Sequence, residues 1–150
     1  MSYQHKEGFQ LIGRSIFIEG NTVHEEYYTG KKTEFYTQLF KEGLLKNLMP
    51  ISVDKKGYAL IVPMEKGIQY YAGVISEESP SGYETFNVST EDYAVTSAKG
   101  DMSRLLFDLL EDRYFSKEET TYNGGVILEV LLNGNPMDAE VELWVPIKRD

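Results

Sequence analysis

The chain carries the same series of predicted elements twice, and this repetition constrains the fold more than any other feature. Each half, about 8–76 and about 83–148, reads as a strand, a helix and then two strands. The predicted helix starts, Lys32 and Met102, lie about 70 residues apart, and the later strands keep a similar offset. We therefore predict one α+β domain, a duplicated βαββ unit whose mainly antiparallel sheet carries two helices on one face.

Hydrophobic periodicity gives the bounds of these elements. Helical spacing of apolar residues covers 32–48 and 102–115, and Pro50 ends the first helix. The predicted strands are 9–18, 58–64, 68–75, 83–88, 93–98, 126–132 and 140–147. The residues expected to be buried between helices and sheet are Leu39, Leu105, Leu109, Val130 and Leu143.

Composition excludes several classes of function. The net charge of −9 argues against direct nucleic-acid binding, which uses clustered lysine and arginine. The chain has no cysteine, and His5 and His24 lack metal-ligand spacing, so we predict no metal and no cofactor. No apolar run approaches the ~20 residues that cross a membrane, and the N-terminus lacks a signal-peptide pattern. We expect a cytoplasmic protein without a membrane partner.

Glu129 is the most informative single residue. It is the one carboxylate in 126–132, Val-Ile-Leu-Glu-Val-Leu-Leu, a run otherwise typical of a strand buried on both faces. Because an unpaired buried charge costs several kcal/mol, such a glutamate needs a partner or a function. The alternative interpretation is a glutamate that faces solvent on an ordinary amphipathic sheet.

Alternation along the two last strands assigns their side chains to faces. Leu143 lies on the aliphatic side, which we assign to the helices, so Trp144 lies on the opposite face. We expect Glu129 to join Trp144 there and to lie opposite Glu142 or Trp144 in the hairpin. The neighbours of Glu129 on that face are Ile127 and Leu131.

The first half supplies Tyr71, Ala59 and Ile61 to the same predicted face. A shift of one residue in register would exchange Tyr71 with Tyr70, and both alternatives stay open. A face that is aromatic, partly apolar and marked by a carboxylate suits a flat, apolar and cationic molecule. We therefore predict a central ligand groove on the face opposite the helices.

At this point the chain resembles the GyrI-like small-molecule-binding domain, which is also the effector-binding domain of AraC-type and MerR-type multidrug-responsive regulators of bacteria. The resemblance spans almost the whole chain and includes 34–48 as the first helix. The matching features are Phe86-x-Val88, Tyr93-Ala94-Val95, Gly100, the helix that follows, Glu129 in its strand, and the ending Glu142-Leu143-Trp144-Val145-Pro146-Ile147-Lys148.

The resemblance implies a duplicated βαββ fold around a groove in which Glu129 meets the positive charge of hydrophobic cations. By the same resemblance, Trp144 is expected to contact the ligand. Tyr71 is expected to contact it because of the pseudo-symmetry of the two halves, and Tyr28 because of its position before the first helix. Because the sequence begins at the first sheet strand, we expect no helix-turn-helix and no self-contained DNA-binding regulator.

Three functions follow from these observations. The first is a stand-alone binding protein for hydrophobic, often cationic, drug-like molecules, acting as a sensor, a regulator-like effector domain or a sequestering protein. The alternative is a hydrolase of cyclopropane-bearing genotoxic natural products, with Glu129 and Tyr71 as the catalytic residues, Glu129 being the base, and with Tyr71 or Trp144 as the stacking wall. The third is a protein-interaction inhibitor of DNA gyrase, which would give the chain a protein partner.

Overall fold

In a computed structural model, the description covers residues 2–20, 26–101, 103–117, 120–133 and 138–148, without the side chains of 26–29 and 103–104. The strands are β1 (Ser2–Lys6), β2 (Phe9–Glu19), β3 (Gly57–Met64), β4 (Gly67–Ile75), β5 (Glu84–Val88), β6 (Glu91–Gly100), β7 (Ile127–Leu131) and β8 (Ala139–Pro146). The helices are α1 (Glu26–Glu42), α2 (Leu44–Leu48), the short 3₁₀ helix η1 (Met49–Ile51) and α3 (Ser103–Phe115).

All strand pairs are antiparallel and form one sheet in the order β1-β6-β8-β7-β3-β4-β2-β5. The α+β class, the antiparallel sheet and the strand–helix–strand–strand order in each half are confirmed. β1 was not predicted, because its sequence, Ser-Tyr-Gln-His-Lys, is polar and its side chains are mostly exposed.

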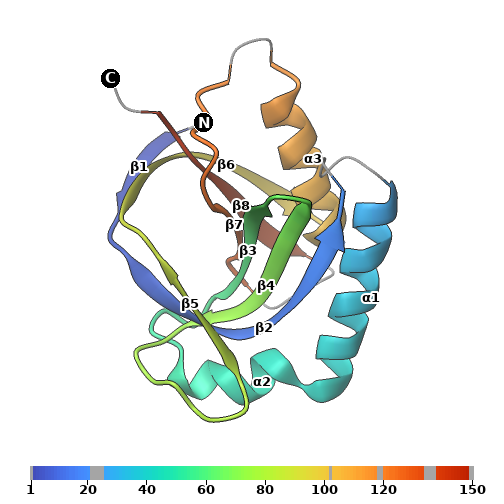
Figure 1. The fold of residues 1–150 in the computed structure, drawn as a ribbon, viewed down its shortest axis with the longest axis vertical. Helices are drawn as coiled ribbons and strands as arrows, with labels where there is room; N and C mark the ends of the chain where they lie inside the picture. Colours follow the sequence, from blue (N-terminus) through green and yellow to red (C-terminus); the bar gives the residue numbers. More distant parts are fainter. Residues whose placement is uncertain (1, 21–25, 102, 118–119, 134–137, 149–150) are drawn as a thin grey trace.

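The sheet closes on itself. Its two end strands, β1 and β5, continue through bends into β2 and β6, and the two bent strands formed in this way pair with each other along their length. β1 runs into β2, and β5 runs into β6, with one continuous register: Lys6 lies opposite Glu91 and, three residues along each strand, Phe9 lies opposite Val88. Thr90 bridges the bend by accepting a hydrogen bond of 2.8 Å from the Gly8 backbone N–H. Figure 1 shows the resulting ring of strands with the helices outside it.

Two hydrophobic clusters occupy the two faces of this sheet. The outer cluster lies between the strands and the helices, and includes Phe35, Leu39, Leu48, Ala59, Ile61, Tyr70, Phe107, Leu110, Ile127, Val141 and Leu143. The inner cluster fills the ring, and includes Phe9, Leu11, Tyr58, Leu60, Tyr71, Phe86, Tyr93, Leu128, Val130 and Trp144. The helices therefore share one face of the sheet, as predicted.

The predicted helix over 32–48 is two helices. Gly43 separates α1 from α2 in a left-handed conformation with φ of 68°, which glycine adopts at little cost. Apolar spacing continues through the break because Leu44 and Leu48 pack in the outer cluster with Leu39. A break that preserves the hydrophobic spacing gives no signal in the periodicity.

The stripe predicted for the second helix is wrong at Leu105 and Leu109, although its members Leu110 and Tyr114 are buried. Leu105 and Leu109 are 47% and 45% exposed, while Phe107, Leu110 and Tyr114 are buried. The segment 105–110 is apolar at five of its six positions, so periodicity alone does not fix which side is buried. The large rings of Phe107 and Tyr114 pack on the sheet instead. Leu39, Val130 and Leu143 are buried as predicted.

Candidate functional site

Glu129 lies in the outer cluster, beneath the helices. β7 pairs with β3 and β8, which places Glu129 opposite Ala59 on one side and Leu143 on the other. The predicted pairing of Glu129 with Glu142 or Trp144 is wrong. Only 1% of Glu129 is exposed, so the alternative of a solvent-facing glutamate is wrong as well.

Lys32 of α1 supplies the opposite charge. Its ammonium lies 3.0 Å from Glu129 Oε2, and Lys32 is 0% exposed. Phe35 and Leu39, three and seven residues further along the helix, lie in the outer cluster and so share the face of Lys32. The salt bridge therefore crosses the interface between helix and sheet, without access to water.

Two tyrosines complete the surroundings of the Glu129 carboxylate. The Tyr70 hydroxyl donates a hydrogen bond to Glu129 Oε1, and the Tyr36 and Tyr70 hydroxyls are 2.6 Å apart. The Lys32 ammonium also lies 5.0 Å from the centre of the Tyr70 ring, within cation–π range. Both charges of the pair thus have additional polar contacts, which a buried ion pair requires.

α3 adds two further carboxyl groups, Asp108 and Glu111. Asp108 Oδ1 lies 3.9 Å from the Lys32 ammonium, and Glu111 is 1% exposed and lies within hydrogen-bonding reach of the Glu129 carboxyl group. We call Lys32, Tyr36, Tyr70, Asp108, Glu111 and Glu129 together the buried polar cluster. It places three carboxyl groups around one ammonium group.

The pKa values show how the cluster distributes its protons. Burial raises the pKa of Glu111 well above its ordinary range, and the Lys32 charge only partly offsets this. The neutral acid can donate a hydrogen bond to Glu129. Burial would lower the pKa of Lys32, but Glu129 and Glu111 outweigh it and raise the pKa. Burial, and then Glu129, raise the pKa of Tyr36. Lys32 therefore remains charged, and Tyr36 remains a neutral donor.

The structure divides the predicted site residues between two faces. Glu129, Ala59, Ile61, Ile127 and Leu131 pack with the outer cluster. Trp144 and Tyr71 belong to the inner cluster. The prediction that all of them share one face is therefore wrong. Tyr28 lies in α1, and its side chain is outside the described part of the structure.

The error arose from two strands, β3 and β7, whose residues Ala59, Ile61 and Glu129 were assigned to the wrong face of the sheet. The parity assigned to β8 is correct, since Leu143 packs with the outer cluster and Trp144 with the inner one. In β7 both faces are buried, so the aliphatic neighbours of Glu129 are equally compatible with either orientation. Of the two tyrosines left open, Tyr70 faces Glu129.

Lys32 and Glu111 were missed, although the sequence carries a signal for each. Lys32 stands on the apolar side of its predicted helix, three residues before Phe35. Glu111 stands beside Leu110 and three residues before Tyr114 on the corresponding side of the next helix. A charged residue within an apolar helical stripe predicts a buried partner.

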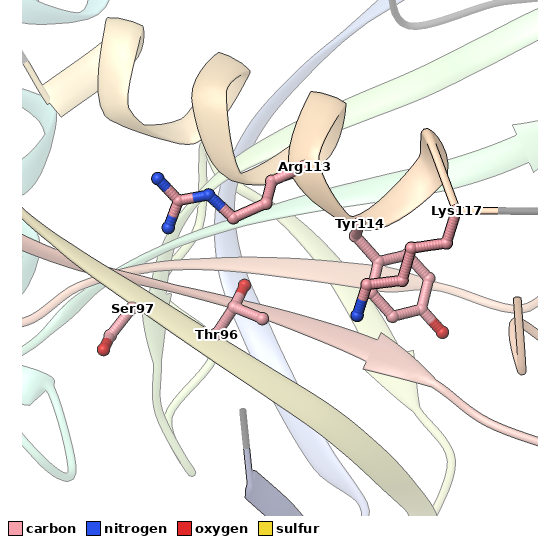
Figure 2. Close-up of a pocket in the computed structure, with 5 residues that line it drawn as sticks. All are labelled: Thr96, Ser97, Arg113, Tyr114 and Lys117. Atoms are coloured by element: carbon pink, nitrogen blue, oxygen red, sulfur yellow. The ribbon is translucent and has the colours of Figure 1, made fainter.

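A separate groove of about 300 Å³ lies between β6 and α3 and contains none of the predicted site residues. Thr96, Ser97, Arg113, Tyr114 and Lys117 line it. Figure 2 shows the Arg113 side chain extending from α3, and that of Lys117 from just beyond the end of α3, beside the hydroxyls of β6. Its basic lining does not suit a cationic ligand. Within the described residues, no group of three or more His, Asp or Glu side chains could hold a metal ion.

With this geometry established, comparison with known proteins identifies the family. The sequence model of Cass2, the integron-associated effector binding protein, matches residues 4–147. The chain belongs to the Cass2 family. No curated protein matches it significantly. None of the helices in the described part of this family member is long and apolar enough to cross a membrane.

Solved structures share the fold of this Cass2-family chain at low sequence identity. SAV2435 bound to tetraphenylphosphonium has a TM-score of 0.80 at 16% identity, with 98% of this chain and 93% of that chain covered. A putative transcription regulation protein from Staphylococcus aureus MU50 has a TM-score of 0.79 at 17% identity, covering 99% and 97%. The integron cassette protein VCH_CASS2 of Vibrio cholerae has a TM-score of 0.68 at 19% identity, with 98% of this chain and 95% of that chain covered. The expected GyrI-like small-molecule-binding domain is confirmed.

Proposed function

We propose that this protein binds hydrophobic organic cations, with Glu129 as the counter-ion of the ligand. The observation that carries this proposal is the pairing of Glu129 with the Lys32 ammonium at 3.0 Å, both without exposed surface. A buried carboxylate that already holds a cation can hold another of the same charge once Lys32 withdraws. The surrounding Tyr36, Tyr70 and Phe35 rings offer apolar and cation–π contacts.

The family and its structural neighbours support the same class of ligand. The Cass2 family is a family of integron-associated effector-binding proteins. SAV2435, which shares the fold, is bound to tetraphenylphosphonium, a bulky aromatic cation. Capture of such compounds fits a drug sensor, a regulator-like effector domain or a sequestering protein. The finer assignments of the sequence analysis, to a multidrug-binding, AraC-type-like bacterial module of the cytoplasm, are part of this proposal.

Calorimetric titration with tetraphenylphosphonium tests the proposal, with triphenylphosphine oxide as a neutral ligand of similar shape. We expect Glu129→Gln to weaken binding of the cation by at least tenfold and to leave binding of the neutral compound almost unchanged. Glu19→Gln is the matched control, because Glu19 is an exposed glutamate at the end of strand β2. Equal loss of both ligands in Glu129→Gln, or no binding by the wild-type protein, would overturn the proposal.

The hydrolase alternative has one observation in its favour. Burial raises the pKa of Glu111 and favours its protonated form, and a protonated carboxyl group within hydrogen-bonding reach of a second carboxyl group is an arrangement used for general acid and base catalysis. The catalytic pair would then be Glu129 and Glu111, with Tyr70 rather than Tyr71 in contact with Glu129. Mass spectrometry of a cyclopropane-bearing ligand recovered after binding distinguishes the functions: intact ligand supports binding alone, and a ring-opened, hydrated product supports hydrolysis.

A further inference from the structure

A second lysine, Lys6 at the end of β1, is held on the inner face of the sheet by three aromatic rings. Its ammonium lies 5.4 Å from the centre of the Phe9 ring, 5.6 Å from Trp144 and 5.9 Å from Tyr58. We call Phe9, Tyr58 and Trp144 the aromatic cage. All three distances lie within the limit of about 6 Å for cation–π contacts, so the three rings surround the ammonium on more than one side.

The cage is separate from the buried polar cluster. Trp144 lies opposite Leu128 in the sheet, whereas Glu129, the next residue of β7, points to the other face. The elements that build the cage also differ: Lys6 and Phe9 come from the two sides of the bend between β1 and β2, and Tyr58 from β3. Lys6, Phe9 and Trp144 are half-buried, so the cage opens to solvent.

Hydrogen bonds outside the cage fix the orientation of two of its rings. The Trp144 indole N–H donates to Glu142 Oε1 at 3.1 Å, and the Tyr58 hydroxyl donates to Asp54 Oδ2 at 2.5 Å. The polar edges of both rings are therefore occupied by hydrogen bonds, and the Lys6 ammonium lies over the ring faces. Glu142 and Asp54 also place negative charge beside the cage.

Within the described residues, neither a carboxylate nor any other acceptor lies within ion-pair or hydrogen-bonding distance of the Lys6 ammonium. This is the opposite of the Lys32 site, where Glu129 accepts a hydrogen bond at 3.0 Å. A site that offers rings but no acceptor suits a cation that has no N–H to donate. Recognition of quaternary ammonium groups is the established use of such cages.

We propose that the aromatic cage of Phe9, Tyr58 and Trp144 is a second ligand site, for the trimethylammonium group of a free small molecule, and that Lys6 occupies it when no ligand is bound. The site lies outside the Glu129 site of the proposed function. The ligand's methyl groups contact the ring faces, and Lys6 moves out into solvent from the edge of the open cage.

Fluorescence titration with choline tests the proposal, because Trp144 is the only tryptophan and reports on the cage directly. The control ligand is 3,3-dimethylbutan-1-ol, which replaces the charged nitrogen by carbon. We expect choline to shift Trp144 emission and to bind at least tenfold more tightly than its neutral isostere. Equal affinities, or no change in emission at saturating choline, would overturn the proposal.

Three variants locate the binding. Lys6→Ala removes the internal competitor and should tighten choline binding several-fold, whereas Phe9→Leu removes one ring and should weaken it at least fivefold. Phe17→Leu is the matched control, because this half-exposed phenylalanine lies at the other end of β2. Glu129→Gln should leave choline binding unchanged, so the proposed function and this site can fail independently. No response to Lys6→Ala and Phe9→Leu, in variants shown by circular dichroism to be folded, would overturn the site.

Phosphatidylcholine vesicles carry the same group in a lipid head. We expect free choline to bind and the vesicles not to sediment the protein. The proposed ligand is a free small molecule whose trimethylammonium group enters the cage, and not a lipid in a membrane. Sedimentation with vesicles and no response to free choline would contradict a site for a free ligand.

Discussion

Lys32 and Lys6 are both held by the folded chain, but by different physical means. Lys32 is 0% exposed, on the helix-covered face, and pairs with the Glu129 carboxylate at 3.0 Å. Lys6 is half-buried on the inner face and contacts three aromatic rings. A charge fully removed from water needs an opposite charge and hydrogen bonds, whereas a charge that keeps part of its hydration needs only polarisable surface. The two regions should therefore respond very differently to loss of the lysine charge.

The largest effect is expected from Lys32→Met, which leaves Glu129 buried without its ammonium partner. Breaking a buried pair on one side costs about 3–5 kcal/mol in free energy of unfolding. Urea denaturation, followed by circular dichroism, measures this change. The double variant Lys32→Met with Glu129→Gln removes both charges and should recover much of the loss. A loss below about 1 kcal/mol in Lys32→Met would mean that the pair does not stabilise the fold.

Two adjacent tyrosines provide the next comparison. Tyr70→Phe removes a hydrogen bond to a buried carboxylate and should cost about 1.5–3 kcal/mol of unfolding free energy. Tyr71→Phe should cost less than about 1 kcal/mol, because the Tyr71 side chain is only half-buried. The measurement is again denaturation at neutral pH. Equal costs for the two variants would contradict the assignment of Tyr70 to the face of Glu129.

Glu111 gives the polar cluster a dependence on pH. The pKa of Glu111 is higher in the folded than in the unfolded chain, so its contribution to stability is complete below the unfolded value of about 4.3 and is lost as pH rises toward the folded value. Glu111→Gln keeps a hydrogen-bond donor at this position but cannot ionise, so its contribution to stability does not fall as pH rises. The variant should therefore gain about 1–2 kcal/mol over the wild type between pH 4 and pH 7. A stability difference that does not change over this range, in denaturation curves at both pH values, would show that Glu111 titrates normally.

The smallest effect is expected at the cage. Lys6→Met keeps the apolar stem and removes the charge, so we expect a loss of about 0.5–1 kcal/mol from the cation–π contacts. Lys66→Met, at the exposed turn between β3 and β4, is the control and should change stability less. Thermal denaturation of the three proteins measures the difference. A cost of Lys6→Met as large as that of Lys32→Met would remove the distinction between the two sites.

The sequence predicted the candidate site in part. Glu129 was correctly singled out as a buried carboxylate that needs a partner, because a lone carboxylate in an apolar strand has few stable environments. Its neighbours Ala59, Ile61, Ile127 and Leu131 were correctly grouped with it. Trp144 and Tyr71 were wrongly added, because a strand buried on both faces carries no alternation that fixes its orientation.

The missing partners came from other parts of the chain. Lys32 is 97 residues from Glu129 in the sequence, and the cage joins Lys6 to Trp144 across the closure of the sheet. Contacts of this kind depend on which helix covers which strand. No local pattern specifies that arrangement, although a charge within an apolar helical stripe predicts that a partner exists.

By itself, the sequence determined the class of fold, the order of its elements and most strand positions, because these follow from local hydrophobic periodicity and from turn residues. It also determined that a buried carboxylate needs a partner. Only the tertiary structure decided which face receives Glu129, which lysine pairs with it, and that the two bent strands close the sheet around an aromatic interior. The physical reason is that strand register and helix docking are settled by the packing of residues distant in sequence, and these contacts exist only in the folded chain.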